Sequence, residues 1–166
     1  MQVTDQDIET LVGRVANLLM AREARVAVAE SCTGGWIAKV LTDKPGSSAW
    51  FEYGLVVYAN EAKETLLAIE PGLLESSGAV SESVAERMAA SVRAISNADI
   101  GVAVTGIAGP DGGTADKPVG TVWLAWDGPG RRSSTRLAEF SGDRESIRRQ
   151  TVSAALAGVL RQLADG

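Results

Sequence analysis

The feature that most constrains the fold is a short and almost wholly apolar run, "ADIGVAV" at residues 98–104. This composition is expected of a strand that is covered on both faces of its sheet. A second predicted strand is "RVAVAE" at 25–30, and a third lies within "GSSAWFEYGLVVYAN" and ends near Tyr58. The segments "VGTVWLAW" and "SSTRLAEF", separated by "DGPGRR", predict a hairpin whose second strand is the more exposed.

Helical patterns alternate with these strands. Four predicted helices have a side chain that can cap the first turn, at Thr4, Thr33, Asn60 and Ser81. The fourth runs to about Ile95 and is expected to point its regularly spaced apolar residues inward, namely Val84, Met88, Val92 and Ile95. The stretch "EPGLLESSGAVS" before it is expected to be broken and rich in turns, and a last helix starts at 142–143 and ends near Leu163.

The order of these elements predicts the fold class. We expect a three-layer α/β/α sandwich with a mixed, mostly parallel sheet of about five strands, because the order is helix, strand, helix, strand, helices, three strands and a helix. The hairpin supplies the antiparallel member. No repeat, low-complexity segment or linker divides the 166 residues, so a single domain over 1–166 is expected.

The absence of histidine excludes several kinds of catalytic site. Ser-His-Asp triads, Cys-His pairs and histidine metal sites all need a residue that this sequence lacks. A single cysteine, Cys32, can form neither an internal disulfide nor a thiolate zinc site. Catalysis must use Ser, Thr, Cys, Lys, Tyr or carboxylates, or a metal held by oxygen ligands.

Charge and hydropathy limit the partners. A net charge of −5 argues against a long nucleic-acid partner, which needs a wide basic surface, but allows a small anionic ligand. No segment approaches the roughly 20 consecutive apolar residues of a membrane helix. The first residues carry acidic charge and lead into no apolar signal core, and the lone cysteine suits a reducing compartment, so a cytoplasmic location is expected.

Polar side chains gather where the predicted strands end. Ser31 follows the first strand, Tyr58 and Lys63 follow the second, and Thr105 follows the third. Ligands of open α/β sheets bind beyond the carboxyl ends of the parallel strands. These residues are therefore the candidates for a site.

Ser31 lies in "AESCTGG", which could hold a nucleophile, cradle a phosphate or simply begin a helix. Because Thr33 is expected to cap the helix, Ser31 is left at the exit of the strand. Gly34 and Gly35 cost about 1 kcal/mol each relative to alanine at a helix start, which favours close backbone approach to a ligand. Bare N–H groups there would suit a phosphate or a developing oxyanion.

A serine nucleophile needs a base, and Lys63 is the candidate. The first turn of a helix disfavours a cation, and burial would lower the pKa of its amine further. Tyr58 could relay the proton or orient the amine. The simpler alternatives are a solvent-exposed lysine and a half-buried aromatic. Cys32 is the rival nucleophile, although a lone cysteine is more often a buried apolar residue.

Other segments could bind an anion. "TGIAGPDGG" could cradle phosphate, but it is no Walker loop. Lys117 and the basic start of the last helix, with Arg144, Arg148 and Arg149, could meet an anion or could simply be solvated.

Six motifs occur in an order that resembles the C-terminal domain of the CinA family. The resemblance extends from about residue 5 to the end of the chain, without the N-terminal domain that many members carry. The motifs are "ESCTGG", "PGSSAWFEYGLVVYANEAK", "GAVSESVAERMA", "ADIGVAVTGIAGPDGG", "KPVGTVWLA" and "GDRESIRRQT".

The resemblance implies an amidohydrolase of pyridine nucleotide recycling, which converts nicotinamide mononucleotide and water to nicotinate mononucleotide and ammonia without metal or cofactor. It implies a catalytic Ser31, Tyr58 and Lys63. The substrate-binding residues expected beside them are Thr33, Gly34, Gly35, Thr105, Gly106 and Arg144. The alternative is a catalytically silent nucleotide-binding or regulatory module of the same fold. Trp123 and Trp126 look exposed and suggest self-association into a homo-oligomer.

Overall fold

The structure is a computed structural model that describes residues 2–129 and 132–164, and it is built on a five-stranded sheet with the order β2-β1-β3-β4-β5. Its strands are β1 (Val26–Glu30), β2 (Phe51–Val56), β3 (Ile100–Gly106), β4 (Thr121–Gly128) and β5 (Arg132–Glu139). β1 pairs in parallel with β2 and β3, and β4 pairs antiparallel with β3 and β5. The mixed, mostly parallel sheet is confirmed, and so is the exposed second hairpin strand, β5. Part of the predicted turn "DGPGRR", at 130–131, lies outside the described residues.

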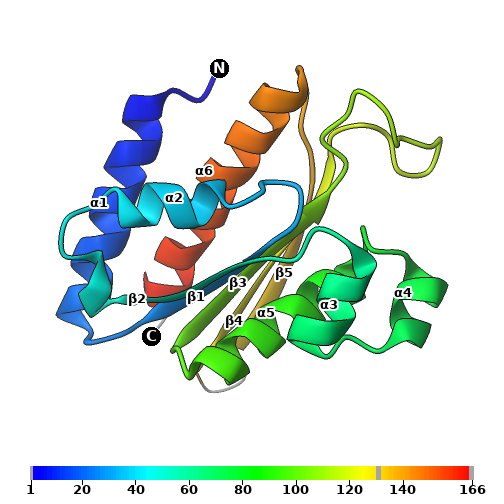
Figure 1. Cartoon of the computed structure of the whole chain (residues 1–166). Helices are drawn as coiled ribbons and strands as arrows, with labels where there is room; N and C mark the ends of the chain where they lie inside the picture. Colours follow the sequence, from blue (N-terminus) through cyan, green and yellow to red (C-terminus); the bar gives the residue numbers. More distant parts are fainter. Residues whose placement is uncertain (1, 130–131, 165–166) are drawn as a thin grey trace.

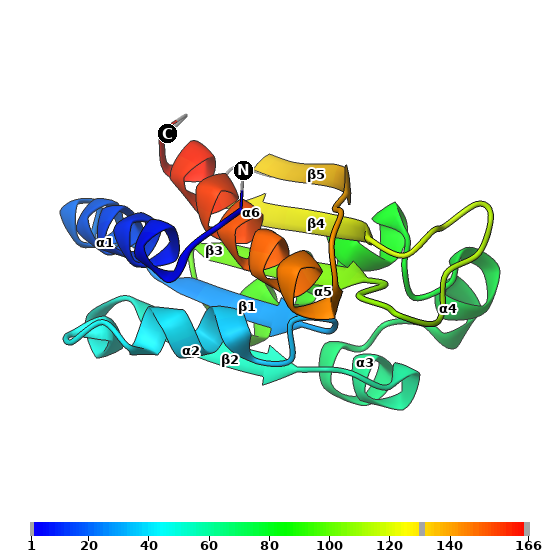
Figure 2. The ribbon, with the colours of Figure 1, turned by 90° about the horizontal axis from the view of Figure 1, so that it is seen from above.

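Helices cover both faces of the sheet (Figure 1 and Figure 2), which confirms the three-layer sandwich. On one face lie α1 (Asp5–Ala21), α2 (Trp36–Thr42) and α6 (Arg144–Ala164). On the other lies α5 (Glu82–Ser96), with α3 (Asn60–Leu67) and α4 (Pro71–Ser77) beside it. A 3₁₀ turn, Ser47–Ala49, precedes β2. Within the described residues, none of the helices is long and apolar enough to cross a membrane.

The strand β3 presents large side chains to one face of the sheet and small ones to the other. Val102 and Val104 belong to the core under α1, α2 and α6, whereas Ala103 belongs to the core under α5. A Cβ at Gly101 would lie 2.1 Å from the carbonyl oxygen of Ala89 in α5. The small residues therefore let α5 pack directly against the strand.

Trp126 fixes α6 against the sheet. Its indole is 2% exposed and donates a hydrogen bond of 3.0 Å to the carbonyl oxygen of Ala155. A Cβ at Gly158 would lie 1.9 Å from the indole, so only glycine leaves room for it. The expectation that Trp126 is exposed is therefore wrong, because α6 covers it. Trp123 is half-buried against the α5 side of the sheet.

The predicted helix starts have mixed outcomes. Thr4 accepts a hydrogen bond from the N–H of Asp7, and Ser81 accepts one from the N–H of Val84, so both predicted caps are confirmed. Asn60 is no cap, because α3 begins at Asn60 itself and its N-cap is Ala59.

Two further expectations about the region from 70 to 96 are wrong. The segment expected to be broken and rich in turns contains a helix, α4, which begins at Pro71, a residue whose fixed φ suits the first helical position. Ile95 is 48% exposed, because it lies in the last turn of α5, beyond Val92, the last buried residue of that helix.

Candidate active site

Three parallel strands end at the same edge of the sheet and bring the predicted site residues there. Ser31 follows the last residue of β1, and its N–H donates to the carbonyl oxygen of Val104 in β3 at 3.1 Å. Tyr58 follows β2 by two residues, and Thr105 and Gly106 end β3. The parallel topology thus gathers residues from distant parts of the sequence at one edge.

The Ser31 hydroxyl and the Lys63 amine form a buried pair. Lys63 is 1% exposed, and its Nζ lies 3.2 Å from Ser31 Oγ. Nζ also donates to the carbonyl oxygens of Val57 at 2.8 Å and of Tyr58 at 3.0 Å. Burial lowers the pKa of Lys63 below its ordinary value, because the charged ammonium is poorly solvated there. The alternative of a solvent-exposed lysine is wrong.

The two carbonyl oxygens can orient the amine as a base. A neutral amine carries two N–H bonds and one lone pair. If the N–H bonds point to Val57 and Tyr58, the lone pair faces the Ser31 hydroxyl. This arrangement fits a general base that takes the proton of a serine nucleophile.

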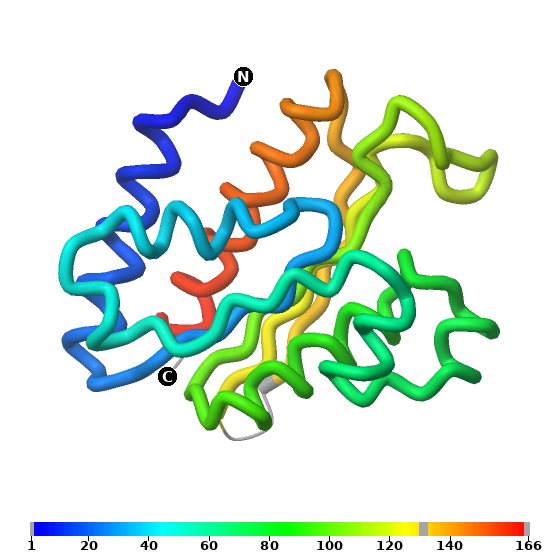
Figure 3. The backbone as a smooth tube through the Cα atoms, in the orientation of Figure 1, coloured from blue at the N-terminus to red at the C-terminus, as the bar shows by residue number. Residues whose placement is uncertain are grey.

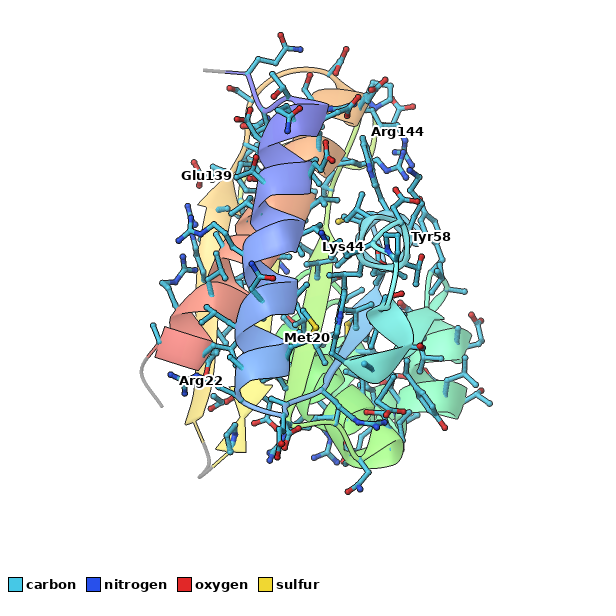
Figure 4. The ribbon with its side chains drawn as sticks, turned by 90° about the vertical axis from the view of Figure 1, so that its left-hand side faces the viewer. Met20, Arg22, Lys44, Tyr58, Glu139 and Arg144 are labelled. Carbon is cyan, nitrogen blue, oxygen red and sulfur yellow. The ribbon has the colours of Figure 1, made fainter. Side chains whose placement is uncertain are left out.

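Tyr58 contributes two different groups. Its backbone carbonyl holds the Lys63 amine, whereas its side chain is 59% exposed. Its hydroxyl accepts a hydrogen bond of 3.2 Å from Arg144, whose guanidinium also donates to the carbonyl oxygen of Gly109 at 2.7 Å. Figure 4 shows the Tyr58 and Arg144 side chains on the same side of the molecule. Arg144 therefore joins α6, the loop after β3 and the segment after β2.

Cys32 points away from this pair and into the core under α1, α2 and α6. Burial raises the pKa of its thiol to about 12. The thiolate, which is the nucleophilic form, is therefore strongly disfavoured at neutral pH. The structure gives Cys32 the environment of an apolar core residue.

Glu30 is the site residue that the sequence analysis missed. Its carboxylate is wholly buried at the end of β1 and accepts a hydrogen bond of 2.5 Å from the Thr33 hydroxyl. It also accepts from the N–H groups of Gly35, Ile37 and Ala38, at 3.1, 3.1 and 2.8 Å. The signal in the sequence was a charged residue at the end of an apolar strand.

These contacts overturn two expectations. Thr33 is not the cap of α2, because its hydroxyl donates to Glu30 and the N-cap residue is Gly35. The N–H groups at the start of α2 are not bare, because Glu30 accepts from three of them. Gly34 and Gly35 instead provide the positive φ angles of the turn, 60° and 96°.

Arg148 holds the same turn from α6. Its guanidinium donates to the carbonyl oxygens of Cys32 at 3.0 Å and of Thr33 at 2.8 Å, and it lies over the ring of Trp36. It is therefore a contact of the turn and not a freely solvated residue. Arg149 pairs with Asp5 and Glu145.

Thr105 and Gly106 are tightly packed. The buried Thr105 hydroxyl donates to the carbonyl oxygen of Ala79 at 2.8 Å, and a Cβ at Gly106 would lie 2.6 Å from the Val122 side chain. The loop that follows projects beyond the sheet (Figure 3), and Lys117 in it donates to the carbonyl oxygen of Ser77 at 3.1 Å. These contacts join the end of β3 to α4 and to the segment that enters α5.

A family model described as the CinA C-terminal domain matches residues 8–163 of this chain. The chain belongs to the CinA C-terminal domain family.

Two relatives of this CinA domain are proteins of similar length. The chain is 48% identical over 160 residues to the nicotinamide-nucleotide amidohydrolase PncC of Escherichia coli K12, with 96% of this chain and 97% of that protein covered. It is 52% identical over 154 residues to the protein of the same name from Pseudomonas putida, with 93% and 96% covered. The crystal structure of the competence/damage inducible protein CihA from Agrobacterium tumefaciens matches with a TM-score of 0.94 and 40% identity, over 98% and 99% of the two chains.

In this CinA domain four of the predicted residues form a connected centre, and the others surround it. Ser31 and Lys63 meet directly, and Tyr58 meets both Lys63 through its carbonyl and Arg144 through its hydroxyl. Side chains or backbone of Thr33, Gly34, Gly35, Thr105 and Gly106 are engaged in protein contacts around that centre.

Proposed function

We propose that this CinA domain is a nicotinamide-nucleotide amidohydrolase that converts nicotinamide mononucleotide and water to nicotinate mononucleotide and ammonia. The observation that carries the proposal is the buried Ser31–Lys63 pair, with 3.2 Å between Oγ and Nζ. The names of the two PncC relatives support the substrate.

The reaction proceeds by acyl transfer through Ser31. Lys63 takes the hydroxyl proton as the Ser31 Oγ bonds to the carboxamide carbon. Lys63 then gives this proton to the amide nitrogen, the C–N bond breaks and ammonia leaves. Lys63 next takes a proton from water, whose oxygen attacks the ester carbon, and the ester bond breaks so that Ser31 regains its proton.

Arg144 and Tyr58 bind the phosphate of the substrate at the mouth of the site. The Arg144 guanidinium has five N–H donors and uses one nitrogen for Gly109 and one for the Tyr58 hydroxyl. Its remaining donors suit an anion, for which guanidinium groups are well matched. Thr105 helps to form the pocket for the amide or the ring.

The test is ammonia release by the purified protein from nicotinamide, its riboside and its mononucleotide. Only the mononucleotide should be hydrolysed rapidly, and Ser31→Ala should abolish release. Ser76→Ala is the control, because this exposed hydroxyl of α4 donates to its own helix.

Three results would contradict or redirect the proposal. If Ser31→Ala retains turnover and Cys32→Ala loses it, the nucleophile is Cys32 and not Ser31. Rapid release from nicotinamide or its riboside would identify a different small amide as the substrate. Binding of the mononucleotide without release by the wild type would support the silent nucleotide-binding module instead.

Two further predictions concern the assembly and the location of the protein. A homo-oligomer remains a prediction, and Tyr53, Val56 and Leu66 are better candidates for its surface than Trp126, because each is more than 40% exposed. Light scattering on the purified chain would test it. A cytoplasmic location also remains a prediction.

A further inference from the structure

The start of α2 holds a buried carboxylate where the sequence had suggested an anionic ligand. Glu30 is 0% exposed, and within the described parts of the chain it makes no ion pair. All four of its hydrogen-bond partners are donors, namely the Thr33 hydroxyl and three N–H groups of the α2 start. A carboxylate satisfies all four, whereas an amide would turn one acceptor into a donor.

The remaining N–H groups of this helix start are also engaged. The N–H of Gly34 donates to the carbonyl oxygen of Ser31 at 3.1 Å, and that of Trp36 donates to the carbonyl oxygen of Thr33 at 3.2 Å. Together with the three that Glu30 accepts, every N–H group from residue 34 to 38 has a protein partner. None of them is available for the oxyanion that forms when Ser31 attacks an amide.

One N–H group beside the nucleophile differs from these. The N–H of Cys32 donates to no acceptor of another residue among residues 2–129 and 132–164, and Cys32 retains 5% exposure. Thr33, the next residue, is wholly buried, so its N–H does not face solvent. The N–H of the residue directly after a serine nucleophile is well placed to meet the oxyanion.

We propose that Glu30 is a positioning residue: by holding the start of α2 it fixes the turn so that the Cys32 N–H faces the oxyanion formed on Ser31. The proposal rests on the proposed serine chemistry. It assigns catalytic contact to a backbone group of Cys32 and indirect action to Glu30. An oxyanion donor acts in the transition state, so its displacement should lower kcat and leave KM nearly unchanged.

The test is Glu30→Gln, which keeps the shape of the side chain but points an NH₂ group at a donor. We expect kcat for the mononucleotide to fall by about 10²- to 10³-fold, the range for a lost oxyanion donor. KM should change less than about threefold on the same argument. The matched control is Thr4→Ala, which removes the side-chain cap of a different helix, α1, and should leave kcat unchanged.

A second readout does not depend on the substrate. An alkyl fluorophosphonate reacts with an activated serine: the Ser31 Oγ–P bond forms, the P–F bond breaks, fluoride leaves and the hydroxyl proton passes to Lys63. Intact-mass spectrometry gives the labelling rate of Ser31. Glu30→Gln should be labelled at least about tenfold more slowly than the wild type, because the phosphoryl oxygen needs the same N–H group.

The outcomes separate the two proposals. If the wild type releases no ammonia but its Ser31 is labelled, the proposed substrate fails and the labelling rates decide the role of Glu30. Equal kcat or equal labelling in folded Glu30→Gln would overturn the positioning role, and so would a loss confined to KM. If circular dichroism shows that Glu30→Gln does not fold, Glu30→Asp is measured in the same way, and wild-type rates in it overturn the proposal. A wild-type Ser31 that never reacts overturns both proposals.

Discussion

The first turns of α1 and α2 satisfy their backbone N–H groups in different ways. At α1 the Thr4 hydroxyl accepts from the N–H of Asp7, and the Asp7 carboxylate accepts from the N–H of Thr4, all within four exposed residues. At α2 the acceptor is Glu30, a buried residue of the preceding strand. A local cap can change without moving anything else, whereas the cap of α2 joins the strand, the nucleophile and the helix.

The largest expected effect tests the chemistry of Ser31, the nucleophile that lies beside the cap of α2. Lys63→Met removes the amine beside Ser31 and should lower kcat by about 10²- to 10⁴-fold, the usual contribution of a general base. The variant should remain folded, since methionine buries well in a site of this size. Steady-state ammonia release and a thermal melt measure both effects.

Lys39→Met is the control for this variant. Lys39 is an exposed lysine of α2 that pairs with Asp43, so its loss should leave kcat unchanged. A Lys63→Met enzyme with normal kcat would mean that Lys63 is not the base for Ser31.

The second effect compares the same substitution in the two helices. Gly35→Ala should destabilise the fold by about 1–2 kcal/mol, because φ is +96° there and a Cβ is strained in that region. Gly13→Ala should stabilise it by about 1 kcal/mol, since Gly13 lies within α1 and its Cβ would meet nothing within 4 Å. Urea unfolding measures the change in the free energy of unfolding for each variant. Changes of the same sign would contradict the prediction.

The smallest effect is a difference in pH dependence. Hydrogen bonds from Thr4 lower the pKa of Asp7, so the α1 cap is complete at neutral pH and is lost only as the pH falls through that lowered pKa. Burial lowers the pKa of Lys63, so its neutral amine increases as the pH rises through a value below 10.5. Activity should therefore rise as the pH rises through that lowered pKa, while α1 responds only in acid.

A pH profile of kcat/KM tests this prediction, with circular dichroism in acid as the second measurement. The same lysine should make the protein more stable as the pH rises from the lowered pKa to 10.5, because the unfolded chain binds the extra proton there. A rise in activity that occurs only above 10.5 would show that Lys63 titrates like an exposed lysine.

The sequence predicted the parts of the site that follow from strand ends. Ser31, Lys63 and Thr105 could be placed together because parallel strands end at one edge. Glu30 could not be recognised, because a glutamate at the end of a strand is usually exposed and nothing local shows that four donors surround it. Thr33 was expected to cap α2 because its actual partner, the Glu30 carboxylate at the end of β1, could not be recognised from the sequence.

Two errors in the fold have a similar physical origin. The glycine and proline at the start of α4 resemble a turn, although proline is well tolerated in the first turn of a helix. Trp126 was expected to be exposed, but α6 packs over it through Gly158. Packing between distant segments decided both the burial of Trp126 and the buried carboxylate.

The contact between Trp126 and Gly158 has a consequence at the opposite end of α6. A helix transmits a shift along its axis as a rigid rod, and Arg148 lies ten residues before Gly158, about 15 Å away at 1.5 Å per residue. The guanidinium that holds the carbonyl groups of Cys32 and Thr33 is thus aligned by a contact that no substrate reaches. A side chain at position 158 would displace α6, and with it Arg148, and would thereby lower the activity without any contact with the substrate.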